Sequence, residues 1–207
     1  MALPTLRIIG FIIGIFLITL AISMAIPMLT LLIFEHPEDL TAFLWSSLIT
    51  LVAGLALVIP GRPQNAQLRP RDMYLLTTGS WTLVCAFAAL PLMLIAHISY
   101  TDAVFETMSG ITTTGSTVLT GLDSLSPGIL IWRSMLQWLG GIGFIGMAVA
   151  ILPLLRVGGM RLFQTESSDW GEKVMPRSHM AAKYLLLIYL ALTLLGFLAF
   201  WAAGMSP

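Results

Sequence analysis

Five long runs of hydrophobic residues, separated by polar stretches, dominate the pattern along the chain. The runs cover residues 8–34, 40–60, 73–98, 127–155 and 184–205. They contain 21 to 29 residues, and only the fourth includes a formal charge, Arg133. A helix needs about 20 apolar residues to cross the hydrocarbon core of a bilayer, so every run is long enough. Because none alternates strictly between polar and apolar positions, we expect helices rather than barrel strands.

Composition supports an integral membrane protein. Of the 207 residues, 57% are hydrophobic and only 10% are charged, whereas a soluble domain has about 25% charged residues. The shortage of charge also excludes a disordered chain. Ten basic residues balance ten acidic ones, so the net charge gives no indication of a nucleic-acid partner. The single Cys85 lies inside an apolar run and is predicted to be a small buried residue.

Positive charges fall almost entirely on one side of this arrangement. Nine of the ten Lys and Arg residues lie before the first run, between the second and third, or between the fourth and fifth. The connection between the first two runs contains Glu35, Glu38 and Asp39 but no basic residue. Because basic residues concentrate in cytoplasmic loops, we expect the N-terminus in the cytoplasm and residues 99–126 on the outer side.

Two patterns in the first run predict details of its helix. Pro27 lies in its interior, so we expect a bend nearby. Gly10 and Gly14 form a GxxxG pattern, which allows a second helix to approach closely, although such patterns also arise from composition alone.

The outward segment is too short to cross the membrane. Ser99 and Asp102 have the spacing of a capping box and predict a helix over residues 101–111. At about 1.5 Å per residue, this helix reaches only about half of the ~30 Å hydrocarbon core. Such a half-helix enters and turns back, and irregular backbone at that depth is tolerated only inside protein or beside a water-filled cavity.

The residues that follow this half-helix are Thr112, Thr113, Thr114 and Gly115. Three β-branched residues and a permissive glycine suit an extended backbone whose carbonyl groups face one axis. Rings of carbonyl groups replace the hydration shell of an alkali cation in selectivity filters. The negative C-terminal end of the half-helix would also favour a cation near the membrane centre. The alternative is an ordinary threonine-rich exterior loop, and the residues alone leave both open.

A longer set of motifs, between residues 74 and 183, resembles a known family. Residues 102–123 resemble the first pore loop of TrkH-type subunits in the Trk/Ktr/HKT potassium transporter superfamily. The helix and cytoplasmic connection after that loop are matched by three further stretches, residues 132–143, 150–155 and 158–162. Residues 166–172 depart from the family, because they lack its Pro-Gly-containing linker.

The resemblance implies a fold of four repeats around one axis, each with an outer helix, a pore half-helix, a filter and an inner helix. Family members run to several hundred residues, so we expect this all-α chain to be the N-terminal portion. The expected domains are two leading transmembrane helices (1–66), the first pore repeat (67–157), a cytoplasmic interfacial linker (158–180), and the first helix of an incomplete second repeat (181–207). A solvated linker is an equal alternative for the third of these.

The resemblance also implies potassium uptake across the bacterial inner membrane, with K⁺ as the transported ion, no organic cofactor and no enzymatic activity. The implied backbone ligands are Thr112, Thr113, Thr114, Gly115 and Ser116, with K⁺ at Thr113, Thr114 and Gly115. The implied partners are the remaining pore repeats of the parent chain, a second copy in a homodimer, cytoplasmic nucleotide-binding regulatory subunits and the lipid bilayer. The alternative is a truncated, non-conducting membrane module that only packs or assembles with other subunits.

Arg133 is the charge that the fourth run must accommodate. It lies six residues after Pro127, about 9 Å of helix rise, so its side chain could reach the outer interface. Alternatively it forms a buried bond to Glu106 or to a filter carbonyl, since ionisable groups inside membranes seek partners. In that case Glu106 and Arg133 support the pore.

Glycines interrupt the middle of the same run. Gly141, Gly143 and Gly146 spell GxGxxG, but no strand precedes them, so a dinucleotide-binding fold is excluded. Each glycine costs a helix about 1 kcal/mol relative to alanine, which predicts a bend and a gate at Gly140, Gly141 and Gly143 unless packing compensates. The alternative is close packing of these small residues against the half-helix.

Overall fold

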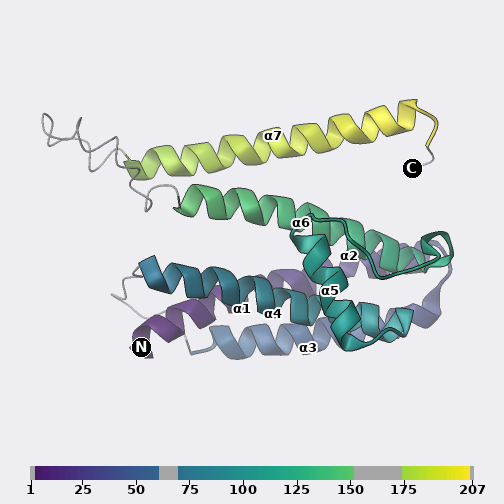
Figure 1. Ribbon diagram of the computed structural model, residues 1–207, viewed down its shortest axis with the longest axis horizontal. Coiled ribbons are helices and arrows are strands. Elements are labelled where there is room, and N and C mark those ends of the chain that lie inside the picture. Colours follow the sequence, from purple (N-terminus) through teal and green to yellow (C-terminus); the bar gives the residue numbers. More distant parts are fainter. Residues whose placement is uncertain (1–2, 61–69, 152–173, 206–207) are drawn as a thin grey trace, which may run out of the picture. The chain divides into compact units, whose positions relative to one another are not determined.

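The computed structural model describes residues 3–60, 70–151 and 174–205, and these ranges contain helices and no β-strand (Figure 1). The α-helices are α1 (Leu3–Ser23), α2 (Ala25–Ile33), α3 (Leu40–Val58), α4 (Pro70–Ala96), α5 (Tyr100–Ile111), α6 (Pro127–Ile151) and α7 (Val174–Ala202). Two short 3₁₀ helices, η1 (Pro37–Asp39) and η2 (Leu122–Ser124), lie in connections. The predicted all-α class is confirmed.

Among the residues that the structure describes, four helical stretches are long and apolar enough to cross a membrane. They are Thr5–Ile33, Pro37–Val58, Arg71–Ala96 and Lys183–Ala202. These match four of the five predicted spans. The remaining run forms α6, a helix of 25 residues. The chain divides into two compact units, Met1–Gly140 and Gly141–Pro207.

The first span is interrupted close to Pro27, as predicted. α1 ends at Ser23, Met24 forms a turn, and α2 starts at Ala25. Proline has no N–H group to donate to the carbonyl four residues earlier, which here belongs to Ser23. The missing bond weakens the helix at the point where the break occurs.

In the first unit, α1, α3 and α4 lie side by side (Figure 1). α1 and α3 approach closely at Gly14 and Gly54. A Cβ atom placed on Gly14 would lie 2.8 Å from the carbonyl oxygen of Gly54, and one placed on Gly54 would lie 2.9 Å from that of Gly14. The backbones therefore touch, and the GxxxG pattern marks a real helix contact. Farther along the core, the rings of Phe43 and Trp132 meet edge to face, with centroids 6.1 Å apart.

α4 presents backbone carbonyl groups to the elements of the pore loop. Pro91 lies inside α4 and cannot donate to the preceding turn. In the two turns before Pro91, three backbone carbonyl groups accept hydrogen bonds from side chains of α5 and α6. Thr107 Oγ1 donates to Cys85 (3.0 Å), the Tyr100 hydroxyl to Ala86 (3.0 Å) and Trp132 Nε1 to Ala88 (3.1 Å). The proline-containing stretch of α4 thus fixes both α5 and the start of α6.

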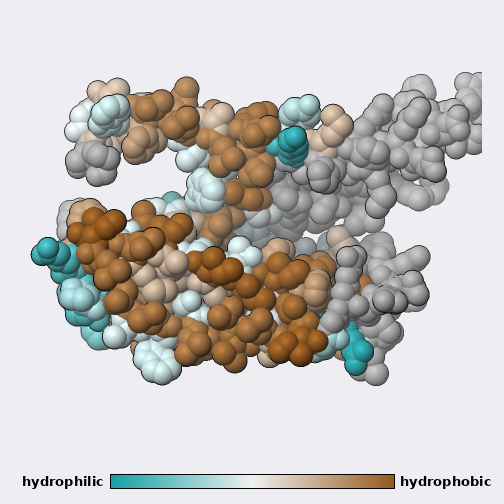
Figure 2. All heavy atoms as spheres, turned by 180° about the vertical axis from the view of Figure 1, so that it is seen from behind, coloured by the Kyte–Doolittle hydropathy of each residue, from teal (hydrophilic) through white to brown (hydrophobic). Residues whose placement is uncertain are grey.

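The outer surface of this unit is strongly hydrophobic. Figure 2 shows brown hydrophobic side chains over the middle of its long helices and teal hydrophilic ones toward the ends. Large exposed side chains here include Ile22, Ile33 and Trp45. A surface of this kind is stable against lipid rather than water.

The second unit contains the end of α6 and the whole of α7. Side chains of α7 from Lys183 onward are almost all exposed, and most are apolar. The predicted boundaries at 66/67 and 157/158 lie outside the described residues, as do residues 158–173 of the predicted linker, including the departure at 166–172. The domain division therefore stays a prediction.

Candidate functional site

The half-helix is present as α5, with 12 residues from Tyr100 to Ile111. At about 1.5 Å per residue it measures about 18 Å. Ser99 caps it: its hydroxyl accepts a hydrogen bond from the N–H of Asp102 at 3.1 Å and donates one to the Asp102 carboxylate at 2.7 Å. The capping pair and the helix bounds agree with the sequence prediction to within one residue.

The C-terminal end of α5 closes in a Schellman motif. The N–H of Thr113 donates to the carbonyl of Gly110 at 2.9 Å, and that of Thr114 donates to Ser109 at 3.0 Å. Thr112 retains helical backbone angles, whereas Thr113 is left-handed with φ +58°. This conformation is rare for a β-branched residue and indicates a strong local constraint.

The predicted extended backbone over residues 112–115 is therefore wrong at its first two residues. Thr112 extends the helical conformation of α5, and the chain reverses at Thr113 because the last carbonyl groups of the helix need partners. Gly115 has φ +79°, a second positive angle that glycine adopts without strain. Alternation of right- and left-handed residues makes successive N–H groups face one side.

This geometry separates the donors of the segment from its acceptors. The N–H groups of Thr112, Thr113 and Thr114 all donate to carbonyl groups of α5. Within the described part of the chain, the carbonyl oxygens of residues 112–115 accept no hydrogen bond, and these residues are exposed. A short row of carbonyl oxygens is therefore available to a ligand, and such oxygens suit a cation.

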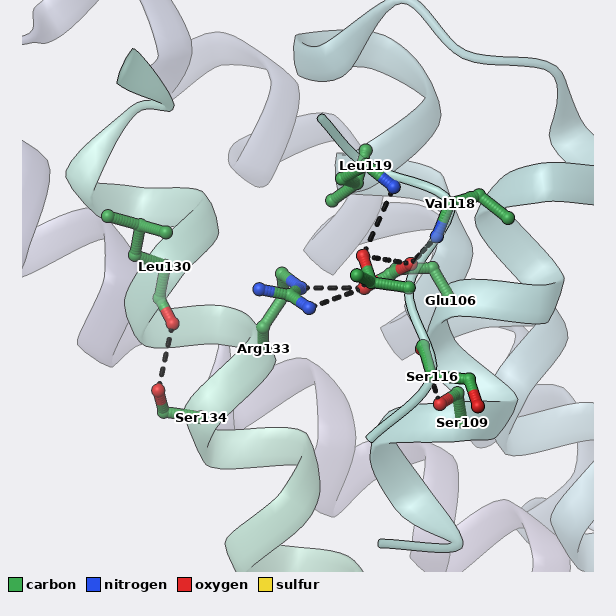
Figure 3. Close-up of polar contacts among 9 residues, drawn as sticks. Glu106, Ser109, Ser116, Val118, Leu119, Leu130, Arg133 and Ser134 are labelled. Atoms are coloured by element: carbon green, nitrogen blue, oxygen red, sulfur yellow. Dashed lines mark hydrogen bonds and ion pairs between the residues drawn. The ribbon is translucent and has the colours of Figure 1, made fainter. Parts of the chain in front are cut away.

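The chain after this row is held by a buried carboxylate. The side chain of Glu106 is only 2% exposed, and Arg133 of α6 binds its Oε1 through both Nε and Nη2, each at 2.7 Å (Figure 3). On the other side, the Thr117 hydroxyl and the Val118 N–H donate to the same carboxylate at 3.0 Å. Of the alternatives for Arg133, the structure shows the bond to Glu106, and the Arg133 side chain is 18% exposed.

A second contact that holds the returning chain lies one turn farther along α5. The Ser109 hydroxyl donates to the carbonyl oxygen of Ser116 at 2.6 Å, as Figure 3 shows. Thr117 Oγ1 also accepts from the N–H of Leu119 at 3.1 Å. The sequence did not predict these roles of Ser109 and Thr117. The available signal was weak: Glu106 and Ser109 are three residues apart and thus share one face of the half-helix.

A small pocket lies between α5, the returning chain and α6. Its lining residues are Glu106, Ser109, Gly110, Gly115, Ser116, Arg133, Leu136 and Gln137. It brings Glu106, Arg133, Gly115 and Ser116, four residues singled out by the sequence, to one place. Because Glu106, Ser109 and Arg133 line it, the pocket belongs to the contacts that hold the returning chain.

The glycines of α6 do not break the helix, which continues from Pro127 to Ile151. A Cβ atom placed on Gly140 would overlap the carbonyl oxygen of Ile111 in α5, so packing compensates there. At Gly141 a Cβ atom would lie 2.5 Å from the Tyr189 hydroxyl oxygen, and at Gly143 it would meet no described atom within 4 Å. The helix is therefore unbroken, the alternative of close packing against the half-helix is confirmed at Gly140, and a gate at these glycines stays a prediction.

Comparison with known proteins gives a consistent result. The sequence profile of the TrkH family, described as cation transport protein, matches residues 40–206. Trk system potassium uptake protein TrkI of Halomonas elongata is 50% identical over 191 residues, covering 92% of this chain and 39% of TrkI. Trk system potassium uptake protein TrkH of Escherichia coli K12 is 42% identical over 199 residues, covering 94% of this chain and 41% of TrkH.

A solved structure agrees with these relatives. The crystal structure of the potassium transporter TrkH from Vibrio parahaemolyticus superimposes with a TM-score of 0.81 and 39% sequence identity, over 97% of this chain and 40% of that chain. The present chain thus spans about two fifths of the length of the relatives it matches.

Proposed function

The chain belongs to the TrkH family of cation transport proteins, and from this premise we propose that it forms part of a subunit for potassium uptake. The family consists of transporters, not enzymes. With its apolar helices, the chain is a multi-pass membrane protein. The proposal concerns the transported ion, its ligands and the assembly.

The free carbonyl row carries the proposal. Oxygens of residues 112–115 would replace water around K⁺, because their N–H groups already bind α5 and cannot repel the ion. α5 ends at this row, and its partial negative charge adds to the attraction for a cation. K⁺ would be held chiefly at Thr113, Thr114 and Gly115.

Ser116 has a different proposed role. The family resemblance implies that Ser116 is among the ion ligands, but its carbonyl oxygen already accepts a hydrogen bond from the Ser109 hydroxyl at 2.6 Å. We therefore propose that the ligand row ends at Gly115 and that Ser116 anchors its outer end. Glu106 and Arg133 would hold the next residues in place as pore support.

The rest of the assembly is inferred from the family. The matched relatives are more than twice as long as this chain, and the remaining pore repeats would supply the other strands of the filter. We propose the division into leading helices, first pore repeat, linker and opening helix of a second repeat. A homodimer, cytoplasmic nucleotide-binding regulatory subunits and an inner-membrane location with a cytoplasmic N-terminus complete the proposal.

One observation favours a second candidate. The chain covers about 40% of each relative, and in the proposed division it would contribute a single filter strand. One strand cannot surround an ion, so the 207 residues alone would be a non-conducting module that packs with other subunits.

Complementation separates the two candidates. A potassium-uptake-deficient bacterial host would express either the chain alone or a chimera in which it replaces the matching segment of E. coli TrkH. We expect growth at limiting K⁺ from the chimera only. Rescue by the chain alone would contradict the need for additional repeats.

A glycine substitution in the chimera tests the filter. Gly115→Ser should abolish K⁺ preference, because serine strains the backbone at φ +79° and adds a side chain at the carbonyl row. Gly121→Ser is the matched control, since Gly121 has φ +65° but lies beyond the row. Equal rescue by Gly115→Ser and the unmodified chimera would refute the filter assignment.

A further inference from the structure

Gly140 of α6 lies against the end of the half-helix that precedes the carbonyl row. We propose that Gly140 is a selectivity-determining positioning residue: its missing side chain lets the α6 backbone cover the Ile111 carbonyl and thereby sets where the ligand row begins. This inference rests on the proposed filter function, and it assigns Gly140 a role other than that of a hinge.

The contact leaves no room for any side chain. Gly140 and Ile111 are both buried. A Cβ atom on Gly140 would overlap the Ile111 carbonyl oxygen, and it would lie 2.6 Å from the carbonyl carbon and 2.9 Å from the Cα. These are backbone atoms, so a larger residue cannot be accommodated by a side-chain rotation.

The Ile111 carbonyl differs from the carbonyl groups just before it in what it faces. A helix ends with four carbonyl groups that have no intrahelical donor. In α5, those of Met108, Ser109 and Gly110 accept the N–H groups of Thr112, Thr114 and Thr113. The fourth, that of Ile111, accepts no hydrogen bond from the described residues and instead faces the backbone at Gly140. The next carbonyl along the chain, that of Thr112, is the first of the free row.

α6 therefore contacts the loop at three levels on one face. Arg133 binds Glu106, Leu136 packs against Gly110, and Gly140 meets Ile111. The spacing of three and four residues places these α6 positions on the same side of the helix. The ion pair between Arg133 and Glu106 fixes one end of this contact. A methyl group added at Gly140, at the other end, would therefore displace the Ile111–Thr112 peptide. That peptide leads directly into the row.

The test compares two glycines of α6 in the E. coli TrkH chimera. Gly140→Ala and Gly143→Ala raise helix propensity equally, but a Cβ atom meets described atoms only at position 140. The readouts are chimera abundance in membranes and inhibition of Rb⁺ uptake by Na⁺. We expect Gly143→Ala to match the unmodified chimera, and Gly140→Ala to lose discrimination against Na⁺ by about tenfold, since ligand positions would shift. Unchanged discrimination in Gly140→Ala would overturn the proposal.

A second growth condition covers loss of assembly. If Gly140→Ala is absent from membranes, the variant is expressed again at a lower growth temperature, which favours the folding of a destabilised protein. We expect it to reach membranes under that condition with reduced discrimination against Na⁺. Absence of Gly140→Ala from membranes at both temperatures would show that the contact serves assembly only and would overturn the selectivity role.

The outcome also separates this inference from the proposed function. Gly115→Ser is measured alongside. If it alters discrimination and Gly140→Ala does not, only the role of Gly140 fails. If neither does, the filter assignment fails as well.

Discussion

Residues 112–115 and residues 116–119 are consecutive, yet the fold uses their backbones in opposite ways. In the first group, N–H groups bind the end of α5 and the carbonyl oxygens stay free. In the second, the Ser116 carbonyl accepts a serine hydroxyl, and the N–H groups of Val118 and Leu119 bind side chains. A backbone segment that binds an ion must keep its carbonyl oxygens free of hydrogen bonds. The adjoining segment is held in place by hydrogen bonds to side chains of α5 and of the loop itself.

The contrast between residues 112–115 and residues 116–119 has an electrostatic cause. Free carbonyl groups repel one another, so a row of them needs support from outside. Here the support is a buried charge pair, Glu106 and Arg133, together with the left-handed turn at Thr113. Three substitutions probe this contrast, each expressed in the chimera and measured by thermal unfolding in detergent.

The largest effect is expected from Arg133→Gln. This change leaves the Glu106 carboxylate buried without its cation, which costs about 3–5 kcal/mol. The double variant Arg133→Gln with Glu106→Gln removes the unpaired charge and should recover much of the lost stability. Ser134→Ala is the control, because Ser134 is exposed on the same helix and, among the described residues, its hydroxyl binds only the carbonyl of Leu130. A double variant no more stable than the single one would refute the charge-pair explanation.

An intermediate effect is expected from Trp132→Phe. The buried indole donates to the Ala88 carbonyl at 3.1 Å and contacts Phe43. The smaller ring keeps part of the apolar contact, but the change removes one hydrogen bond, worth about 1 kcal/mol, and adds the cost of a small cavity at a fully buried position. Trp45→Phe is the matched control, since Trp45 is 62% exposed. Equal melting temperatures for the two variants would show that the bond to α4 does not brace α6.

The smallest effect is expected from Thr113→Gly. Glycine relieves the left-handed strain but gives the unfolded chain more freedom, so the net change should stay within about 1 kcal/mol. Thr114→Gly has no such strain to relieve, because Thr114 lacks a positive φ, and it should be less stable than Thr113→Gly. If Thr113→Gly were the less stable of the two, the strain argument would be wrong.

Much of the fold follows from the sequence because its signals are local. The length of each apolar run predicted the long helices, Pro27 predicted the interruption after Ser23, and Ser99 with Asp102 predicted the start of α5. Each signal acts within a few residues of the element that it specifies. Local chemistry and the tertiary structure agree at these points.

Other features depend on contacts between distant residues and could not be predicted in the same way. Three threonines favour extended backbone, but the carbonyl groups of α5 impose a left-handed turn on Thr113. Packing of Gly140 against the half-helix was one of two alternatives, beside a bend, because the sequence does not show that the Ile111 backbone lies against it. Ser109 and Thr117 carry no pattern that identifies their partners across the loop.

The central claim is that carbonyl oxygens of residues 112–115 bind the transported ion. The most direct measurement is a crystal structure of the chimera soaked with Tl⁺, a K⁺ substitute located by its anomalous scattering. The account predicts an anomalous peak within about 3 Å of these oxygens, at Thr113, Thr114 and Gly115. Residues 112–115 facing bulk water, with every Tl⁺ peak elsewhere, would contradict it.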